Sequence, residues 1–381
     1  MMTEQTPLEA ATPDVGPDAQ VSWKSIWAFI KGLWGRLGEV TSNPGVMLGV
    51  MVAILLLAGA LRLTGVDWDE HHHLHPDERF LTMVENSLQW PKSFKEYLDT
   101  EVNPLNPYNH GHGTYVYGLF PLVLVKFLGQ ITGKVGYDGI YLVGRVMSAA
   151  MDMLCIVLVF FTGKRLYDAR VGLLGALLLS LSVLNIQNAH YFTVDTSTTL
   201  FVTLALYMAV RVAQGREHTA QGEGWGSVLM LGLAFGLAVS AKISVLTFLL
   251  VIGLAYLLRI LGRWHRGEVD PATALTDWQG RLGKLTLSFR VRADERCGGA
   301  NDLERFFFHA VRAALSLLVV LLVAVFVFRV VQPQAFTGPG LLDFKINPKW
   351  KENMDYVRKL VSGQIDYPPS HQWTARAPVV Y

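Results

Sequence analysis

Apolar residues gather in seven blocks along the 381-residue chain, each close to the length of a membrane-crossing helix. A helix needs roughly 17–25 predominantly apolar residues to cross the hydrocarbon core of a bilayer, so the pattern predicts about seven spans. An eighth apolar stretch, 115–129, is interrupted by Pro121 and Lys126 and is better suited to a helix at the membrane surface. The predicted fold class is therefore an all-α polytopic membrane protein. The seven blocks cover residues 46–63, 142–162, 171–188, 198–212, 227–241, 243–261 and 310–331.

Polar and charged segments flank these blocks and divide the chain into parts. Residues 1–22 are polar and Pro-rich and lack the apolar core of a secretory signal peptide, so we expect a disordered tail. Segment 23–44 places Trp, Ile, Phe and Leu among Lys24, Lys31 and Arg36 at helical spacing, which predicts an amphipathic helix on the membrane surface. The remaining predicted parts are a transmembrane domain (45–331) with a first outer loop (65–143) and a basic inner loop (262–309), and an outer C-terminal segment (332–381).

The distribution of Lys and Arg predicts which side of the membrane each segment faces. Ten of these residues lie between positions 259 and 312, more than in any other predicted loop of the same side. Because short loops rich in Lys and Arg stay in the cytoplasm, we expect this loop and the N-terminus inside. The loop 65–143 and the segment after 332 are then outside. The prediction is a multi-pass protein of the cell membrane whose site faces outward.

Composition narrows the class of protein further. Hydrophobic residues make up 51% of the chain and charged residues 17%, below the roughly 25% charged residues of soluble domains. The net charge of +2 implies no bulk attraction to nucleic acid. Cys155 and Cys297 have neither a metal-ligand spacing nor a disulfide pattern. The bilayer is the expected partner, and nucleic acid is not.

The stretch "VDWDEHHHLHPDERF", residues 66–80, gathers five acidic residues and four histidines directly after the first span. Pro76 fits the first turn of a helix that continues through "RFLTMVENSL". Asp77 and Glu78 then lie at the N-terminus of this helix, where the helix dipole stabilises negative charge. Favourable capping or a solvated loop would explain them. The functional alternative is a carboxylate held at the membrane boundary, ready to accept a proton.

Several segments in order resemble the polyprenyl-phosphate-dependent glycosyltransferases of the protein O-mannosyltransferase and aminoarabinose transferase superfamily, which have the GT-C membrane fold and are similar to glycosyltransferase family 39. The likeness covers most of residues 46–261, and its motifs are individually loose but specific in their order and spacing. Family members usually continue through further spans. We therefore expect the chain, whose last segment is 332–381, to be a fragment or an unusually short protein. The segments that carry the likeness are "LHPDERF", "NPLNPYNHGHGTYVYGLFPLVLVKFLG", "GRVMSAAMDMLCIVLVFFTGKRLYDARVGLLGALLLSLS", "AHYFTVDTSTTLFVTLALYMAVR" and "GLAVSAKISVL".

The resemblance implies transfer of a sugar from a polyprenyl-phosphate donor to a hydroxyl of a protein, lipid or glycan acceptor, with inversion at the anomeric carbon. By the same resemblance, Asp77 is the general base and Glu78 its neighbour and partner. Arg145 and Lys242 are the expected ligands of the donor phosphate. Snorkelling of a long basic side chain toward the interface is the competing explanation for Lys242.

His75, Arg79 and Asp195 complete the predicted substrate pocket. For Asp195, capping of the following helix is the competing explanation. A divalent metal is a further hypothesis, because imidazole is a common ligand, although the spacing of these histidines matches no known metal motif. The histidines concerned are His71, His72, His73, His75, His110 and His112.

Two other classes of function stay open at this point. A polytopic transporter would also carry ionisable residues, but it usually keeps them near the middle of the bilayer. Here most candidates map to the outer boundary, and Asp152 is the exception because it lies deep in a predicted span, where we expect it to pair with a neighbouring helix. The other alternative is a non-catalytic membrane subunit with a partial GT-C-like fold.

Overall fold

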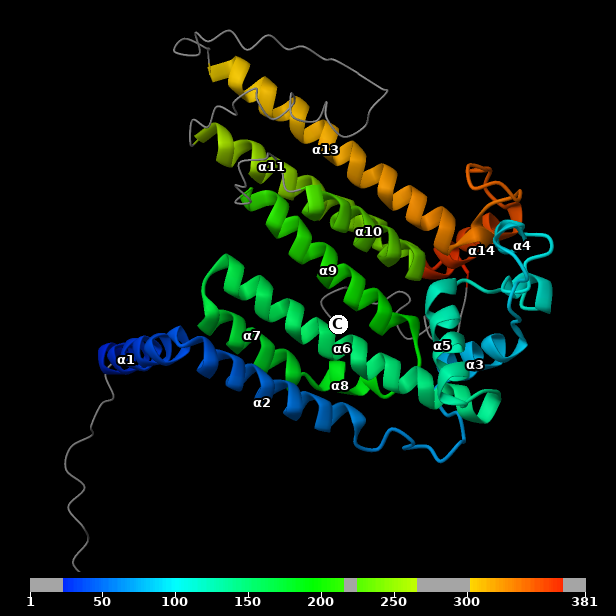
Figure 1. Ribbon diagram of the computed structural model, residues 1–381, viewed down its shortest axis with the longest axis horizontal. Coiled ribbons are helices and arrows are strands. Elements are labelled where there is room, and N and C mark those ends of the chain that lie inside the picture. The colour runs from blue at the N-terminus through cyan, green and yellow to red at the C-terminus, as the bar shows by residue number, and fades with distance from the viewer. Residues whose placement is uncertain (1–22, 216–224, 266–301, 366–381) are drawn as a thin grey trace, which may run out of the picture. The chain divides into compact units, whose positions relative to one another are not determined.

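The computed structural model describes residues 23–215, 225–265 and 302–365, and within these ranges the regular elements are helices (Figure 1). The predicted all-α fold is confirmed. The predicted tail, 1–22, and most of the predicted basic loop lie outside the described residues. The α-helices are α1 (Trp23–Ser42), α2 (Pro44–Leu63), α3 (Pro76–Ser87), α4 (Phe94–Leu98), α5 (Leu119–Thr132), α6 (Tyr137–Leu166), α7 (Ala169–Ser180), α8 (Val183–Ala189), α9 (Val194–Gln214), α10 (Trp225–Ala241), α11 (Leu249–His265), α13 (Asp302–Val331) and α14 (Pro348–Val361). The 3₁₀ helices are η1 (Pro107–His110), η2 (Ile243–Phe248) and η4 (Pro333–Ala335).

Every block predicted to span the membrane coincides with a helix or with a broken pair of helices. Five helical segments are long and apolar enough to cross a bilayer, and a sixth is obtained if α7 and α8, bent by 60°, count as one span. Helix α10, with 17 residues, and α5, with 14, are apolar but shorter. The protein is therefore a multi-pass membrane protein, with five or six spans by length and composition among the described residues. The five segments are Pro44–Leu63, Tyr137–Leu166, Val194–Gln214, Ile243–His265 and His309–Val331.

The chain divides into two units, residues 1–50 and 51–381. The first unit contains α1, whose bounds agree closely with the predicted amphipathic segment. Trp23, Trp27 and Phe29 are exposed on this helix together with Lys24 and Lys31. An exposed set of aromatic and basic side chains is typical of helices that lie in the membrane interface. That placement stays a prediction.

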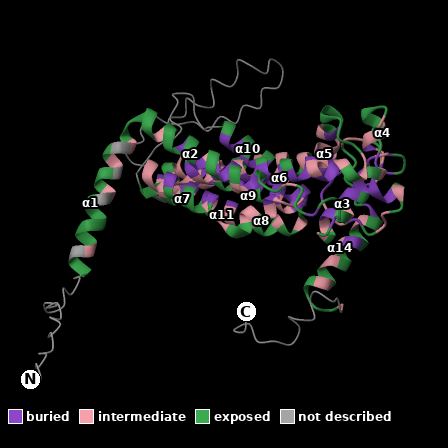
Figure 2. Cartoon of the chain, turned by 90° about the horizontal axis from the view of Figure 1, so that it is seen from below, coloured by how far each residue is buried: buried purple, intermediate pink, exposed green. Residues whose placement is uncertain are grey.

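Close helix contacts organise the second unit. Helix α9 lies between α6 and α10, and α10 in turn packs on α13 (Figure 1). A Cβ atom at Gly172 of α7 would lie 2.5 Å from the Phe160 carbonyl oxygen of α6, and one at Gly236 of α10 would lie 2.8 Å from the Ala324 carbonyl oxygen of α13. Small residues at such contacts let transmembrane helices approach closely. Figure 2 shows the buried positions between the helices and the exposed positions on the outside.

A buried ion pair joins α2 to α6. Arg62 is fully buried, and its Nε lies 2.5 Å from Asp152 Oδ2. Arg62 also donates to the Leu179 and Ser180 carbonyls at 3.2 and 2.9 Å, at the break between α7 and α8. Asn185 of α8 donates to the other carboxylate oxygen of Asp152 at 2.9 Å. The pair therefore satisfies carbonyls that a helix break inside a membrane would leave unbonded, and the predicted pairing of Asp152 is confirmed.

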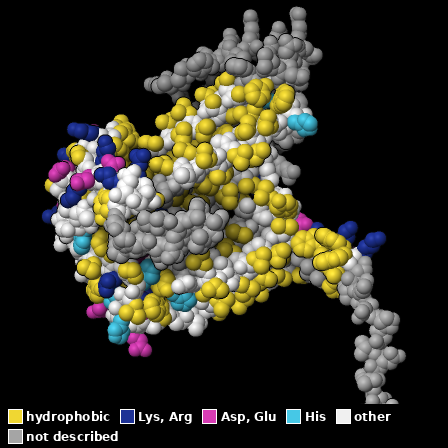
Figure 3. All heavy atoms as spheres, turned by 180° about the vertical axis from the view of Figure 1, so that it is seen from behind, with side chains coloured by type: hydrophobic (Ala, Val, Ile, Leu, Met, Phe, Trp, Pro, Cys, Tyr) yellow, Lys and Arg dark blue, Asp and Glu magenta, His cyan; other side chains and the backbone are white. Residues whose placement is uncertain are grey.

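The first outer loop and the C-terminal segment meet at one end of the bundle. Helices α3, α4, α5 and α14 lie there (Figure 1), and charged side chains gather over this end while hydrophobic ones cover much of the bundle (Figure 3). The Tyr97 hydroxyl donates to the Val330 carbonyl at 2.8 Å, and the Thr100 hydroxyl to the Phe336 carbonyl at 2.5 Å. These bonds tie residues more than 230 positions apart. The two segments predicted to share a side of the membrane thus lie together.

The ion pair at the helix break gives a first prediction. Replacing Arg62 by Met leaves Asp152 buried without its cation, which we expect to lower the free energy of unfolding by about 3–5 kcal/mol. Unfolding of the detergent-solubilised protein in mixed micelles measures this loss. The double variant Arg62→Met/Asp152→Leu should recover part of it, because both charges are gone. A single variant as stable as the wild type would contradict the role assigned to the pair.

Candidate functional site

The candidate site begins where the acidic stretch enters α3. His75 is the N-cap, and its Nδ1 accepts a hydrogen bond from the Glu78 N–H at 3.3 Å. Pro76 occupies the first helical position, as the sequence predicts. The His75 ring stacks on Tyr191, with 4.2 Å between ring centroids. The capping group is therefore a histidine held in place by an aromatic ring, which positions Asp77 and Glu78 in the first turn.

Glu78 and Arg145 bond to each other in the interior, and both are fully buried. Arg145 Nε lies 2.9 Å from one carboxylate oxygen of Glu78, and Nη2 lies 2.5 Å from the other. The same Nη2 lies 2.9 Å from Asp69 Oδ2, and Nη1 donates to the Val66 carbonyl at 2.7 Å. The Phe192 N–H donates to Glu78 at 2.7 Å. Glu78 and Arg145, both predicted to contact substrate, thus bond to each other, and all three guanidinium nitrogens have protein partners.

Asp69 is the second carboxylate of this cluster. Burial alone would raise the pKa of Asp69, but hydrogen bonds from Arg145 and from the Leu74 N–H lower it below its ordinary value. The Arg145 guanidinium also lies over the rings of Tyr141 and Trp68, with Cζ 4.6 and 5.3 Å from their centroids. Such cation–π contacts stabilise a buried guanidinium further. The cluster therefore surrounds one guanidinium with two carboxylates and two aromatic rings.

The loop between the first span and α3 carries backbone strain. Glu70, His71 and His73 have φ values of 47°, 67° and 49°, in the left-handed region that non-glycine residues rarely adopt. Each such residue costs on the order of 1–3 kcal/mol, and they persist only where surrounding structure holds them. Here Asp69 holds the strained loop in place. Its carboxylate accepts a hydrogen bond from the Leu74 N–H, and its carbonyl oxygen lies 2.8 Å from His72 Nδ1. Strain of this kind is found most often at functional sites.

Asp77 has a different environment from Glu78. It is half-buried, and the Tyr117 hydroxyl donates to its Oδ1 at 3.2 Å. Neighbouring residues on a helix point about 100° apart, so Glu78 faces α6 while Asp77 does not share its partners. Arg79, the next residue, is exposed. The first turn of α3 thus presents one carboxylate that is fully paired inside the protein and one that is accessible.

Lys242 and Asp195 form the second part of the candidate site. Lys242 Nζ lies 2.7 Å from Asp195 Oδ1, and the two side chains are 47% and 45% exposed. The competing explanation for Asp195, a helix cap, is wrong, because the N-cap of α9 is Thr193 and Asp195 bonds Lys242 instead. Lys242 lies at the turn between α10 and η2, as the sequence predicts, so an accessible cation is present at this end.

The segment that carries Tyr117 connects these two parts. Next to Tyr117, the Gly118 N–H donates to the Ala241 carbonyl at 3.1 Å, one residue before Lys242. A Cβ atom at position 118 would lie 2.6 Å from the Ala241 Cα, so only glycine allows this approach. Tyr117 therefore reaches Asp77 with its side chain while its neighbour contacts the Lys242 turn.

Gln332 fixes the same segment from the end of α13. Its side chain is buried, with Oε1 accepting from the Leu119 N–H at 2.9 Å and Nε2 donating to the Tyr117 carbonyl at 3.2 Å. The sequence analysis missed both Tyr117 and Gln332. The aromatic residue directly before Gly118, ahead of an apolar run, is the signal that could have drawn attention to Tyr117. Gln332, 215 positions away from it, offers no local signal.

Comparison with known protein families gives a match for one segment of the chain. Residues 122–268 match the family model described as dolichyl-phosphate-mannose-protein mannosyltransferase. These residues, here called the glycosyltransferase segment, make up less than half of the chain and are similar to that family. The resemblance found from the sequence motifs is thus confirmed. The glycosyltransferase segment includes Arg145, Asp195 and Lys242, whereas Asp77 and Glu78 precede it.

Solved structures of membrane glycosyltransferases are similar to the chain at low identity. The Saccharomyces cerevisiae protein O-mannosyltransferase Pmt1–Pmt2 complex bound to the sugar donor has a TM-score of 0.45 and 16% identity, over 77% of this chain and 35% of that chain. The Archaeoglobus fulgidus oligosaccharyltransferase in the apo form has a TM-score of 0.42 and 13% identity, over 83% and 39%. The oligosaccharyltransferase AglB of the same organism, with an inhibitory peptide and a dolichol-phosphate, has a TM-score of 0.42 and 14% identity, over 84% and 37%.

The chain therefore spans little more than a third of the length of these structures. No curated protein matches the sequence.

The histidines that were considered as metal ligands make separate contacts. In the described ranges, no three His, Cys, Asp or Glu side chains are grouped so that they could hold a metal ion. The buried ring of His73 lies against the rings of Tyr137 and Tyr141. Each of four others has its own polar neighbour, which is the Tyr141 hydroxyl for His71, the Asp69 carbonyl for His72, the Pro104 carbonyl for His110 and the Ser87 hydroxyl for His112.

The Asp69 environment predicts a pH-dependent stability. A carboxylate whose pKa is lowered in the folded state contributes stability above its ordinary pKa of 3.8, and this contribution is lost as the pH falls through the lowered value. We expect Asp69→Asn to lower the free energy of unfolding by about 1–3 kcal/mol at pH 7, because Arg145 keeps its bonds to Glu78. Thermal unfolding of the solubilised protein between pH 7 and pH 3 should show the difference from wild type shrinking below pH 3.8. The exposed neighbour variant Glu70→Gln is the matched control, and a difference that persists unchanged at pH 3 would contradict the assignment.

Proposed function

We propose that the protein is a membrane glycosyltransferase that transfers a sugar from a polyprenyl-phosphate donor to an acceptor hydroxyl on the outer side of the membrane. Support comes from the glycosyltransferase segment, whose family description names a dolichyl-phosphate-linked mannose. The placement of accessible charged side chains at one end of an apolar bundle also supports it, because a lipid-linked donor presents its phosphate at the membrane boundary.

The observation that carries the proposal is the asymmetry between Asp77 and Glu78. A general base must reach the proton it removes, and a carboxylate already bonded to a guanidinium inside the protein is a poor candidate. Glu78 is in that position, whereas Asp77 is half-buried with a tyrosine hydroxyl as a partner. We therefore assign the base to Asp77. Glu78 and Arg145 become positioning residues in this proposal, because they hold the start of α3 against α6.

The proposed reaction is a single displacement. The Asp77 carboxylate takes the proton of the acceptor hydroxyl. The oxygen of that hydroxyl attacks the anomeric carbon from the face opposite the phosphate. The bond from the anomeric carbon to the phosphate oxygen breaks, and the electron pair leaves with the phosphate, so the configuration inverts. The Lys242 ammonium offsets the charge that develops on the leaving phosphate, and Asp195 holds Lys242 in place. His75 and Arg79 lie beside the base in the proposed substrate pocket.

A transporter is the second candidate, because transporters place ionisable residues on broken helices inside the membrane. The Arg62–Asp152 pair beside the α7–α8 break has that character. Its groups, however, bond each other, Asn185 and the carbonyls of the break, which accounts for the pair without a transported substrate. A non-catalytic subunit is the third candidate, and the transfer assay below separates it from an enzyme.

The assigned base gives a direct prediction. Asp77→Asn keeps the shape of the side chain but cannot accept a proton, so turnover should fall about 10²–10⁴-fold with little change in donor binding. Transfer of radiolabelled sugar from a polyprenyl-phosphate donor, with the protein inserted in liposomes, measures the rate. Asp99→Asn is the matched control, since Asp99 is a half-buried carboxylate of the same outer loop with one side-chain hydrogen bond at 3.2 Å. Wild-type turnover in Asp77→Asn would show that the base is elsewhere.

The proposed outward site also predicts accessibility. Single cysteines at Val102, Leu342 and Tyr167, all exposed positions, can be introduced in a Cys297→Ser background that keeps the buried Cys155. A membrane-impermeant maleimide added to intact cells should label positions 102 and 342, which lie at the end with α3 and α14. Position 167, between α6 and α7, should react only after permeabilisation. The reverse pattern would place the site on the cytoplasmic side.

A further inference from the structure

His190, directly after α8, has both of its ring nitrogens at main-chain carbonyl oxygens. Nδ1 lies 2.8 Å from the Ile186 oxygen, and Nε2 lies 2.9 Å from the Thr64 oxygen, 126 positions away in the sequence. A carbonyl oxygen accepts hydrogen bonds and cannot donate them, so both contacts are hydrogen bonds only when both nitrogens carry a proton. In neutral histidine, one nitrogen lone pair would face an oxygen lone pair. The geometry therefore fits the imidazolium form.

Two helix ends favour a positive charge at this place. Ile186 belongs to the last turn of α8, of which His190 is the C-cap, and Thr64 directly follows α2. The last carbonyls of a helix lack partners within the helix, and their partial negative charge attracts cations. The imidazolium thus bonds a carbonyl at the end of each helix and joins α2 to α8. Because the side chain is only partly buried, solvent can supply and remove its proton.

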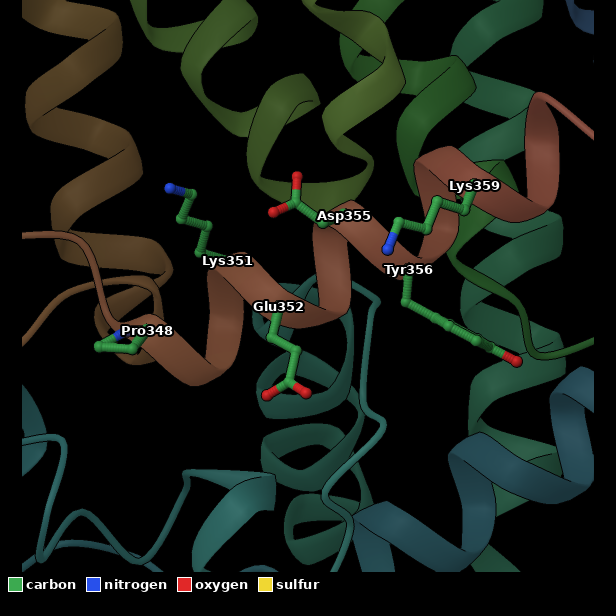
Figure 4. A pocket seen from close by; sticks show the side chains of 6 residues that line it. All are labelled: Pro348, Lys351, Glu352, Asp355, Tyr356 and Lys359. Atoms are coloured by element: carbon green, nitrogen blue, oxygen red, sulfur yellow. The ribbon is translucent and has the colours of Figure 1, made fainter. Parts of the chain in front are cut away.

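The charged groups on the elements around His190 have other partners. They form the pairs Arg62–Asp152, Arg145–Glu78, Arg145–Asp69, Asp67–His71, His73–Asp138 and Asp195–Lys242. The other titratable groups of the loop after α2 are Glu70, His72 and His75. In the described ranges His190 has no ion pair within 4.0 Å with any of these groups, nor with the exposed carboxylates of Glu352 and Asp355, which extend to opposite sides of α14 (Figure 4). The two carbonyl contacts are therefore the direct interactions of its ring that depend on its protonation.

The two residues that follow His190 contact the start of α3. The Tyr191 ring stacks on His75, the N-cap of α3, with 4.2 Å between ring centroids. The Phe192 N–H donates to the Glu78 carboxylate at 2.7 Å. Three consecutive residues thus connect the end of α2 and the end of α8 to the helical turn that carries the proposed base. A change in the position of His190 is transmitted to that turn through its neighbours.

We propose that His190 is a pH-sensitive positioning residue, whose imidazolium bonds the Thr64 and Ile186 carbonyls and so holds the first turn of α3 in place. These two bonds are called the His190 clasp. The consequence for turnover rests on the function proposed above, whereas the clasp itself does not. Histidine is the side chain whose ordinary pKa, about 6.5, allows a change of charge near neutral pH. When the proton is lost, the Thr64 bond is the one that breaks, because Ile186 belongs to the helix that His190 itself caps.

Hydrogen–deuterium exchange of the full chain in nanodiscs tests the clasp without any donor. His190→Arg keeps a cation with several donors at every pH, and His190→Gln is neutral at every pH. At pH 5.5 residues 64–75 should be equally protected in the wild type and in His190→Arg. They should exchange about 3–10-fold faster in His190→Gln, the effect of one net hydrogen bond. At pH 8.5 the wild type should exchange like His190→Gln.

His110→Gln is the matched control, since His110 is also partly buried and its ring bonds one main-chain carbonyl, that of Pro104, at 2.8 Å. It should leave the exchange of residues 64–75 unchanged at both pH values. Peptides from α10 and α13 report whether each variant keeps the folded bundle. The wild type alone gives a second measurement, because exchange of residues 64–75 relative to that of α10 should rise about 3–10-fold from pH 5.5 to pH 8.5. Equal exchange of the wild type and His190→Gln at pH 5.5, or full protection of the wild type at pH 8.5, overturns the clasp.

Turnover separates this inference from the proposed function. In the liposome assay, kcat/KM of the wild type should fall about 3–10-fold between pH 6 and pH 8.5 relative to that of His190→Arg. The loss of activity at acidic pH that follows protonation of the base should be common to both proteins. The exchange pattern without any sugar transfer supports the clasp and refutes the proposed function, whereas sugar transfer without the exchange pattern refutes the clasp alone. The exchange pattern together with pH profiles that coincide in the wild type and His190→Arg refutes the positioning role.

Discussion

The outer end of this protein depends on one buried guanidinium. Arg145 bonds Glu78 and Asp69, and through them it joins α6 to the start of α3 and to the strained loop before it. Removing a cation and carboxylates from water costs several kcal/mol per ion, and this cost is offset here only because each guanidinium nitrogen and both Glu78 oxygens have partners. Each broken bond leaves a buried charged group with one partner fewer, which is costly in an apolar interior. Rigidity at the first turn of α3 follows directly.

That rigidity explains why neighbouring carboxylates differ so much. Glu78 faces α6 and is hydrogen-bonded to Arg145 and to the Phe192 N–H. Asp77 points about 100° away on the helix and is half-buried beside Tyr117. Two adjacent carboxylates with the same surroundings would compete for one cation and for the same protons. Pairing one of them permanently removes that competition. In the proposed function, Glu78 thus holds the start of α3 in place without contacting substrate itself.

The sequence predicted the elements of the fold better than the contacts of the site. Long apolar blocks define transmembrane helices by composition alone, and the expected blocks coincide with helices or with the α7–α8 pair. The break in that pair was not expected, because Leu181 and Ser182 carry no strong breaking signal and the partner that stabilises it, Arg62, lies 117 positions before Leu179. Asp77, Asp195 and Lys242 were selected as candidates from their place in the motifs. The resemblance assigned Arg145 to the donor phosphate, and nothing local in the sequence indicates its bond to Glu78 across 67 positions.

Gln332, which the sequence analysis missed, and Gly118 act through the backbone of the outer loop. Gln332 binds the main chain on both sides of Gly118, and Gly118 itself touches Ala241 through its N–H. Main-chain contacts leave little trace in residue type apart from the glycine, so no pattern of charges could reveal them. They nevertheless decide where Tyr117 lies, and therefore where Asp77 lies relative to the Lys242 turn. In the proposed function, the relative position of Asp77 and Lys242 therefore depends on an irregular loop that is bonded to the ends of both α10 and α13.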